Sequence, residues 1–303
     1  MSDVNRKWLY LIVLSIIWGT SYILIKKGLE GFSAIQLGAV RIVLASFFLF
    51  LIGFRTLRGI SRKQWKWVAL SGMVGSLFPI FLFAFAQTEI DSGIASILNS
   101  LVPLFTILVG AGAFKISFSR RQFLGVAVGL AGASMLILLG AGLNPDQNYQ
   151  YAGLVVLATV CYAFNANIIK DKLQEVPPLA IAVGNFACIL PAGIAMLIYS
   201  GAFSQDVIKG PEFLSSLGYL VILCIMGTCV AKVMFNRLIQ ISSPVFSVSV
   251  TYLIPIVGIL WGSADGETFT ILQLLAALVI LLGVYLVNSR KAARQRESSL
   301  SGS

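Results

Sequence analysis

Long apolar stretches alternate with short polar separators along the whole chain. Each stretch holds about 20 mainly apolar residues, which is the length that an α-helix needs to cross a lipid bilayer. The predicted spans are residues 7–27, 33–54, 66–88, 92–114, 120–141, 151–171, 178–200, 216–239, 244–263 and 271–289. The separators carry charged residues and turn formers, and none is long enough for a soluble domain. The pattern predicts an all-α integral membrane protein with ten transmembrane helices.

Composition supports a membrane protein and narrows its chemistry. Of the 303 residues, 58% are hydrophobic and 11% are charged, against about 45–50% and 25% in soluble domains. The chain has no histidine, which excludes Ser–His catalytic triads and histidine metal sites. No carboxylate pair lies in the middle of a predicted span. We therefore expect no enzyme activity, no metal and no cofactor.

The positive charges indicate an orientation. The net charge is +10, with 22 lysines and arginines. With the N-terminus inside, 17 of these fall on the inner side and 3 on the outer side. Cytoplasmic loops of membrane proteins carry such an excess of Lys and Arg. We expect a bacterial-type plasma (inner) membrane location with both termini cytoplasmic, and no nucleic-acid partner.

The two halves of the chain resemble each other. Residues 18–26 align with residues 162–170 at a shift of 144. Further on, a shift of 152 places Gly75 on Gly227 and Pro103 on Pro255. Near the end of each half, a shift of 151 matches Gln122 to Gln273 and Gly132 to Gly283. The matches occur in order with small gaps, which indicates an internal repeat.

An odd number of spans in each half makes the repeat inverted. The second five-helix half then enters the membrane from the opposite side, a recurring plan of secondary transporters whose substrate site lies near the midplane between the halves. The expected units are residues 1–143 and 144–290, followed by a disordered cytoplasmic tail at 291–303.

An ordered set of residues resembles the EamA family of the drug/metabolite transporter superfamily. The set comprises Trp18-Gly19-Thr20-Ser21, Arg41, Pro103, Pro255, Gly266-Glu267 and Gly283-Val284. The resemblance implies ten spans, an inner-membrane location and secondary transport of small metabolites, often amino-acid export. The chain departs from symmetry in two places. Lys115 stands in the first half where Glu267 stands in the second, and Asn185 occupies the slot of Arg41.

Two cations lie well away from the ends of the predicted spans, in the part of a span where a charge costs at least about 2.5–3.5 kcal/mol and marks function by default. Lys232 lies about one turn from the middle of the eighth span. It either faces a central cavity, binding a substrate carboxylate or exchanging a proton, or reaches toward the inner surface. Arg41 lies about eight residues into the second span. It either binds an anionic group or ties neighbouring helices together.

Uncharged polar and aromatic residues near the middle of the spans complete the predicted substrate site. Each needs a partner in a bilayer, so such groups face a cavity or form interhelical hydrogen bonds. The candidates are Trp18, Tyr22, Asn99, Tyr162, Asn165, Asn236, Thr251 and Tyr252.

Proline and glycine patterns predict features of packing and motion. Pro103 and Pro255 should kink the fourth and ninth spans. Their equivalent positions suggest hinges for alternating access, with static packing as the other interpretation. Gly125-x-x-x-Gly129, with Gly132 on the same face, predicts close packing within the half or formation of a homodimer.

Together these features predict a secondary active transporter that exports a small polar metabolite, an amino acid or a derivative, by alternating access. A proton gradient or the substrate's own gradient would drive it. The alternatives are an importer of an organic anion, nucleobase or vitamin, and a non-transporting membrane receptor or assembly subunit.

Overall fold

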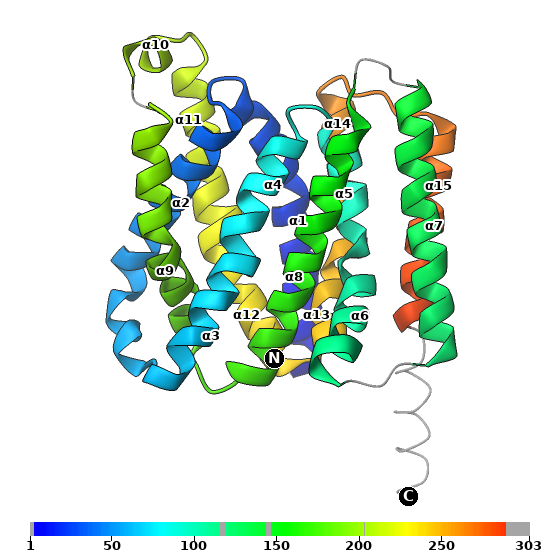
Figure 1. Cartoon of the computed structure of the whole chain (residues 1–303), viewed down its shortest axis with the longest axis horizontal. Helices are drawn as coiled ribbons and strands as arrows, with labels where there is room; N and C mark the ends of the chain where they lie inside the picture. Colours follow the sequence, from blue (N-terminus) through cyan, green and yellow to red (C-terminus); the bar gives the residue numbers. More distant parts are fainter. Residues whose placement is uncertain (1–2, 116–118, 144–146, 203, 289–303) are drawn as a thin grey trace, which may run out of the picture.

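A computed structural model of the chain describes residues 3–115, 119–143, 147–202 and 204–288. All regular structure in these residues is helical (Figure 1). The predicted tail at 291–303 lies outside the described residues.

The first half of the chain contains five membrane-spanning segments, some of them divided into shorter helices. They are α1 (Asp3–Leu29), α2 (Ala34–Gly53) with η1 (Phe54–Gly59), α3 (Arg62–Gly72) with η2 (Met73–Leu77) and α4 (Phe78–Ala86), α5 (Ser92–Leu98) with η3 (Asn99–Leu101) and α6 (Val102–Phe114), and α7 (Arg120–Leu143).

The second half repeats this order. Its segments are η4 (Tyr149–Tyr151) with α8 (Ala152–Lys172), α9 (Pro178–Tyr199), α11 (Phe213–Ile222) with η5 (Leu223–Val230) and α12 (Ala231–Ile241), α13 (Pro244–Val248) with η6 (Ser249–Tyr252) and α14 (Ile254–Ala264), and α15 (Ile271–Asn288). A short helix, α10 (Gln205–Ile208), lies between α9 and α11.

The ten predicted spans are confirmed as helical segments with small shifts at their ends. In the described residues, nine segments are long and apolar enough to cross a membrane, and α15 is a shorter apolar helix. In Figure 1, α1 begins at the lower end of the bundle and α8 begins at the upper end. The first helices of the two halves therefore run in opposite directions, as an inverted repeat requires.

Local sequence explains several helix ends. Ser33 and Gln36 form a reciprocal capping box at the start of α2, in which each side chain bonds the other residue's backbone N–H. The matched glutamines Gln122 and Gln273 have the same role. Gln122 Oε1 accepts from the Ser119 N–H, and Gln273 Oε1 accepts from the Thr270 N–H. This sequence repeat is thus a repeated start signal for α7 and α15.

Two kinds of irregular turn interrupt the spans at equivalent positions. The segments η2 and η5 are π-helical turns around Gly75 and Gly227, and η3 and η6 are 3₁₀ turns. Pro103 and Pro255 each lie in the first turn of the helix after a 3₁₀ turn. Since proline has no N–H to donate, the regular hydrogen-bond ladder stops there. The predicted kinks are confirmed as breaks in the helices.

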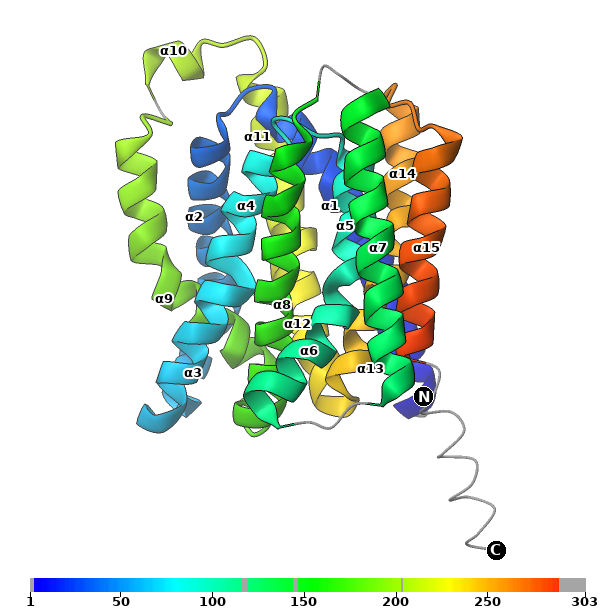
Figure 2. The same cartoon turned by 45° about the vertical axis from the view of Figure 1, so that its right-hand side comes forward.

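The helices α7 and α15 pack side by side at one edge of the bundle (Figures 1 and 2). Glycine permits this contact, because a Cβ added to Gly283 would meet backbone atoms of Gly125 and Gly129. A Cβ on Gly132 would similarly meet Ile280. The small-residue face of α7 therefore packs against the other half. The expected packing within its own half also occurs, because a Cβ on Gly129 would meet Leu104 of α6. Both contacts leave this face covered within one chain.

Candidate functional site

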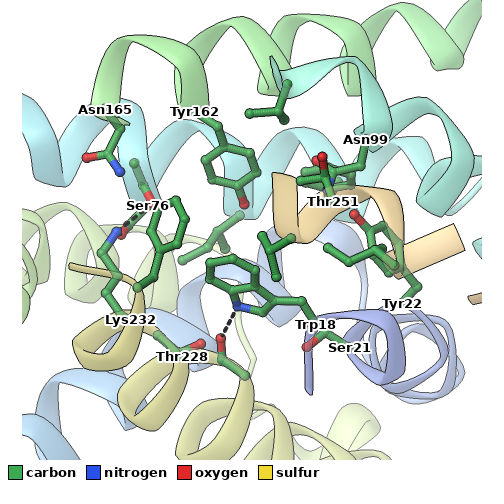
Figure 3. A pocket seen from close by; sticks show the side chains of 18 of the residues that line it. Trp18, Ser21, Tyr22, Ser76, Asn99, Tyr162, Asn165, Thr228, Lys232 and Thr251 are labelled. Carbon is green, nitrogen blue, oxygen red and sulfur yellow. Dashed lines mark hydrogen bonds between the residues drawn. The ribbon is translucent and has the colours of Figure 1, made fainter. Parts of the chain in front are cut away.

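A cavity lined by polar, aromatic and aliphatic residues lies at the centre of the bundle, between the two halves (Figure 3). Its volume of about 100 Å³ is room for several water molecules or a small ligand, since one water needs about 10–15 Å³. Residues from both halves line it, namely Trp18, Ser21, Tyr22, Ile25, Arg41, Gly75, Ser76, Ile80, Phe83, Asn99, Val102, Tyr162, Asn165, Phe186, Gly227, Thr228, Lys232, Phe235, Val248, Val250, Thr251 and Ile254.

Lys232 lies in this cavity and binds the opposite half of the protein. It follows η5 in the first turn of α12, and only 8% of its surface is exposed. Its Nζ donates to Gly75 O at 2.6 Å and to Ser76 Oγ at 2.6 Å, both in η2 (Figure 3). The side chain therefore points into the bundle rather than toward the inner surface. A buried ammonium with two neutral acceptors keeps capacity to bind an anion.

Arg41 also lines the cavity and forms the reciprocal contact. It belongs to α2 in the first half, and its Nε donates to Thr228 Oγ1 of η5 at 3.3 Å. Thr228 and Ser76 are equivalent in the repeat, because both follow the glycine of a π-helical turn. Each half thus contributes one cation that binds a hydroxyl of the other half. Asn185, which occupies the slot of Arg41, is fully buried near Ser71 and does not line the cavity.

The carbonyl groups of the two π-helical turns bind donors from the opposite half. Gly75 O accepts from Lys232, and Gly227 O accepts from the Trp18 indole Nε1 at 3.0 Å. A π-helical turn displaces carbonyls from the regular ladder, so they are available to side chains. The predicted residues Trp18 and Lys232 therefore make equivalent contacts on opposite sides of the repeat.

Aromatic rings form an apolar wall beside the cations. Phe83 stacks on Tyr162 with 6.1 Å between ring centroids, and Tyr22 meets Phe83 edge to face at 5.6 Å. Trp18 packs edge to face against Phe235 at 4.9 Å. The wall offers a surface for an apolar substrate side chain.

The polar candidates differ in their remaining hydrogen-bond capacity. Asn165 Oδ1 accepts from Ser71 Oγ at 2.6 Å, and the Thr251 hydroxyl donates to Val248 O at 2.9 Å. Asn99, in η3, is 4% exposed, and its Oδ1 has no hydrogen-bond partner among the described residues. Asn99 is therefore the lining side chain with an unused amide acceptor.

Two predicted site residues do not line the cavity. Asn236 is fully buried and donates through Nδ2 to Pro178 O at 3.2 Å. The Tyr252 hydroxyl contacts Val284 O of α15 at 3.5 Å. These side chains use their polar groups between helices, so their expected contact with substrate is not supported by the structure.

Sequence reasoning missed Thr228 as a site residue. A single hydroxyl in an apolar span is a weak signal, because threonine can bond a carbonyl of its own helix. The signal was available in the repeat, since a shift of 152 aligns Thr228 with Ser76.

A network of charged residues lies beyond the cavity, where α1 and α14 end and α5 begins. Lys26 Nζ pairs with Asp265 Oδ2 at 2.8 Å and with Glu267 Oε1 at 2.9 Å. Glu267 also accepts from Ser92 N, Ser92 Oγ and Gly93 N at 2.7–3.0 Å. Its side chain is 1% exposed. The network thus joins one end of α1 to the start of α5 and the end of α14.

Asp265 makes a second ion pair in this network, with Lys27 at 2.7 Å. Burial alone would raise the pKa of Asp265. Its hydrogen bonds and ion pairs with Lys26 and Lys27 outweigh burial and lower this pKa below its usual value.

The opposite end of the bundle is joined by different chemistry. Lys170, which matches Lys26 in the repeat, donates to Ser242 O at 2.6 Å and to Ile239 O and Gln240 O at 3.4 Å. These carbonyls end α12, where a cation interacts favourably with the helix dipole. The described residues contain no group of three or more His, Cys, Asp or Glu side chains that could hold a metal ion.

A bundle of apolar helices in two opposed halves, around a central cavity that contains two cationic side chains, is the architecture of a membrane transporter, not of an enzyme. The chain belongs to the EamA-like transporter family, whose profile matches residues 6–138 and again residues 151–289. The resemblance found in the sequence is thus confirmed, as are the helical membrane fold and the transporter class.

Named relatives cover nearly the whole chain. The uncharacterized inner membrane transporter YedA of Escherichia coli is 28% identical over 288 residues, spanning 93% of this chain and 90% of YedA. A probable amino-acid metabolite efflux pump of Salmonella typhimurium is 24% identical, spanning 91% of this chain and 92% of the pump. A probable terminal-alkyne amino-acid exporter of Streptantibioticus cattleyicolor is 24% identical, spanning 98% of each.

A solved crystal structure of another protein has the same fold. It superposes with a TM-score of 0.66 and covers 98% of this chain and 100% of that chain, at 18% sequence identity.

Proposed function

We propose that this chain is a secondary active exporter of a small carboxylate metabolite, an amino acid or a derivative of one, across the bacterial inner membrane. Two relatives with full-length similarity are named as amino-acid metabolite or amino-acid exporters. The observation that carries the proposal is the buried ammonium of Lys232, which lies in a cavity between the two halves.

In this proposal the substrate carboxylate binds Lys232. Lys232 holds Gly75 O and Ser76 Oγ of the first half at 2.6 Å each. Because a carboxylate is a stronger acceptor than either neutral oxygen, it would displace them. Substrate binding would then remove a link between the halves, which is how occupancy could change the conformation.

Arg41 and the remaining lining residues have supporting roles. Arg41 holds Thr228 across the same interface and gates the cavity. Trp18, Tyr22, Asn99, Tyr162, Asn165 and Thr251 give the cavity its shape and neutral hydrogen-bonding groups. Pro103 and Pro255, at the two 3₁₀ breaks, act as hinges for alternating access.

The remaining parts of the proposal concern membrane context and energy source. The excess of Lys and Arg on one side supports cytoplasmic termini, with Lys26 and Glu267 at the outer end. Transport is driven by a proton gradient or by the substrate's own gradient. A protonophore distinguishes the two energy sources, because it abolishes only transport that depends on the proton gradient. The proposed homodimer gains no support from Gly125 and Gly129, since α15 covers them.

Counterflow in proteoliposomes tests the proposal. Vesicles loaded with an unlabelled amino acid or amino-acid derivative should accumulate the labelled compound. The variant Lys232→Met should lose this uptake, and Lys209→Met, which alters an exposed lysine, should retain it. Equal uptake by all three proteins would overturn the role of Lys232. Absence of counterflow with every carboxylate would overturn the substrate class.

A second candidate function is the import of an organic anion. The two cations in the cavity lining favour an anion of either origin. Everted and right-side-out membrane vesicles distinguish the directions, because an exporter fills everted vesicles under an imposed gradient.

A further inference from the structure

The two cations of the cavity have no counter-ion among the described residues. Arg41 and Lys232 line the cavity, and none of the described lining residues is an aspartate or a glutamate. The titratable side chains that interact electrostatically with Arg41 are those of Tyr162, Cys224, Tyr22 and Cys229. Phenols and thiols are mostly neutral at neutral pH, so none of them balances the guanidinium.

The two cations lie close together, because both belong to one short stretch of the cavity wall. Arg41 Nε donates to Thr228 Oγ1 at 3.3 Å, and Thr228 precedes Lys232 by four residues in the chain. Side chains about one helical turn apart are neighbours, and Figure 3 shows both of these in the cavity wall. The guanidinium and the ammonium also interact electrostatically. Two like charges therefore repel each other in the centre of the bundle, where one ligand can contact both.

Each cation has its own neutral acceptors, so one carboxylate does not satisfy both. Lys232 donates to Gly75 O and Ser76 Oγ, whereas Arg41 donates to Thr228 through Nε alone. A carboxylate bound to Lys232 leaves one positive charge in the lining without a counter-charge, which is unfavourable in a buried site. A second carboxylate on the same ligand removes it. The planar guanidinium suits this second group, because it binds a carboxylate through two parallel bonds.

We propose that the cavity binds a metabolite with two carboxylates on a short chain, such as an acidic amino acid or a dicarboxylic acid. One carboxylate binds Lys232 and the other binds Arg41, so the ligand neutralises the lining. This inference rests on the proposed function, because it refines the substrate class of the same cavity. It also gives Arg41 a direct contact with substrate in addition to its contact with Thr228.

Binding to the purified full-length protein tests the second carboxylate with two matched pairs of compounds. Succinate is compared with succinamate, and glutamate with glutamine. Each amide keeps the size of its acid and lacks one negative charge, and all four compounds are short enough to suit a cavity of about 100 Å³. The acid that binds more tightly of the two should bind at least about tenfold more tightly than its own amide, because a charged acceptor replaces a neutral one at Arg41.

Substitutions of Arg41 separate its contribution from that of Lys232. Arg41→Gln should lower the affinity for the acid at least about tenfold and the affinity for the amide less than about threefold, so the preference is lost. Arg41→Lys keeps the charge and should keep most of the preference. Arg55→Gln removes an exposed arginine and should change neither affinity. Lys232→Met should weaken binding of every compound, which reports on the proposed function.

The two hypotheses fail in different ways. If the amides bind as tightly as the acids and Lys232→Met weakens binding of both, the proposed carboxylate site stands and the second carboxylate site is wrong. The comparison in the wild-type protein decides this even where a variant does not fold. If Arg41→Gln folds and leaves the preference for the acid unchanged, Arg41 does not bind the second carboxylate and the proposal is overturned. If no carboxylate binds, both hypotheses are wrong.

Discussion

Lys26 and Glu267, 241 residues apart in the sequence, form an ion pair with 2.9 Å between Nζ and Oε1. The same carboxylate accepts two backbone N–H groups and one hydroxyl from the start of α5. With every partner in place, this buried carboxylate links three helices that surround the cavity. Removing the charge of Glu267 should therefore lower the stability of the protein strongly, even when the substitution keeps the size of the side chain.

Glu267→Gln should lower the free energy of unfolding by about 2–4 kcal/mol, because it leaves Lys26 and the α5 N–H groups with a poorer partner. Thermal unfolding in detergent measures the effect. Glu30→Gln is the matched control, since Glu30 pairs with Lys27 at 2.8 Å but its side chain is 42% exposed. Such a pair contributes about 0–1 kcal/mol. Equal shifts for the two variants would contradict the structural role of Glu267.

The network should also give the protein an acid-sensitive component of stability. Burial opposes ionisation of Asp265, but its pairs with Lys26 and Lys27 outweigh burial and lower its pKa in the folded protein. A lowered carboxyl pKa stabilises the fold above the unfolded value of about 3.9. That contribution is lost as the pH falls through the folded pKa. The difference in melting temperature between wild type and Asp265→Asn should thus shrink below about pH 4. A constant difference down to about pH 3 would count against this assignment.

Trp18→Phe tests the contact between Trp18 and the π-helical turn η5. The change keeps a ring against Phe235 but removes the bond to Gly227 O, leaving a buried carbonyl without its donor. We expect a loss of about 1–3 kcal/mol in stability and reduced counterflow. Trp261→Phe removes a comparable bond, to Thr20 Oγ1 at 3.0 Å, from an exposed residue. Its effect should stay below that of Trp18→Phe in both measurements.

Gly283→Ala tests the contact between α7 and α15. The new Cβ would meet the backbone of Gly125 and Gly129, which cannot move as a side chain can. We expect destabilisation by about 1–3 kcal/mol, the usual cost of overpacking. Gly218→Ala in α11 is the control. Its Cβ meets nothing within 4 Å, so the helix should gain about 0.5–1 kcal/mol. A neutral Gly283→Ala would show that the two helices are not closely packed.

Pro103→Ala and Pro255→Ala test the proposed hinges. Each restores an N–H next to a 3₁₀ turn and favours a continuous helix. The transport rate should fall several-fold while substrate affinity changes little. Pro191→Ala, in the interior of α9, should leave the rate closer to that of wild type. Equal rates for all of these variants would favour static packing over hinge motion.

The membrane spans and most of the cavity could be predicted from the sequence for physical reasons. Repeated runs of about 20 apolar residues are typical of membrane-spanning helices, and charges such as Arg41 and Lys232 are too costly in a span to lie there by chance. The polarity of a residue in a span did not tell whether its side chain lines the cavity or forms a hydrogen bond between helices. Asn236 and Tyr252 satisfy the same criterion, yet they bond to carbonyls between helices.

Other features had no clear signal in one chain. Pro103 predicts the break at η3. The π-helical turn η5 contains no proline, and a single glycine such as Gly227 does not specify a π-helical turn. The pairing of α7 with α15 across the two halves depends on tertiary packing, which the Gly125-x-x-x-Gly129 spacing does not specify.

The equivalent residues Lys26 and Lys170 hold the two ends of the bundle with different partners. Lys26 pairs with carboxylates and is 30% exposed, whereas Lys170 binds the carbonyls that end α12. Salt weakens a partly exposed ion pair, whereas a carbonyl carries no net charge. Ionic strength should therefore loosen the Lys26 end more than the Lys170 end. Under the proposed alternating access, the salt concentration at the Lys26 end would then bias the balance between the two open states.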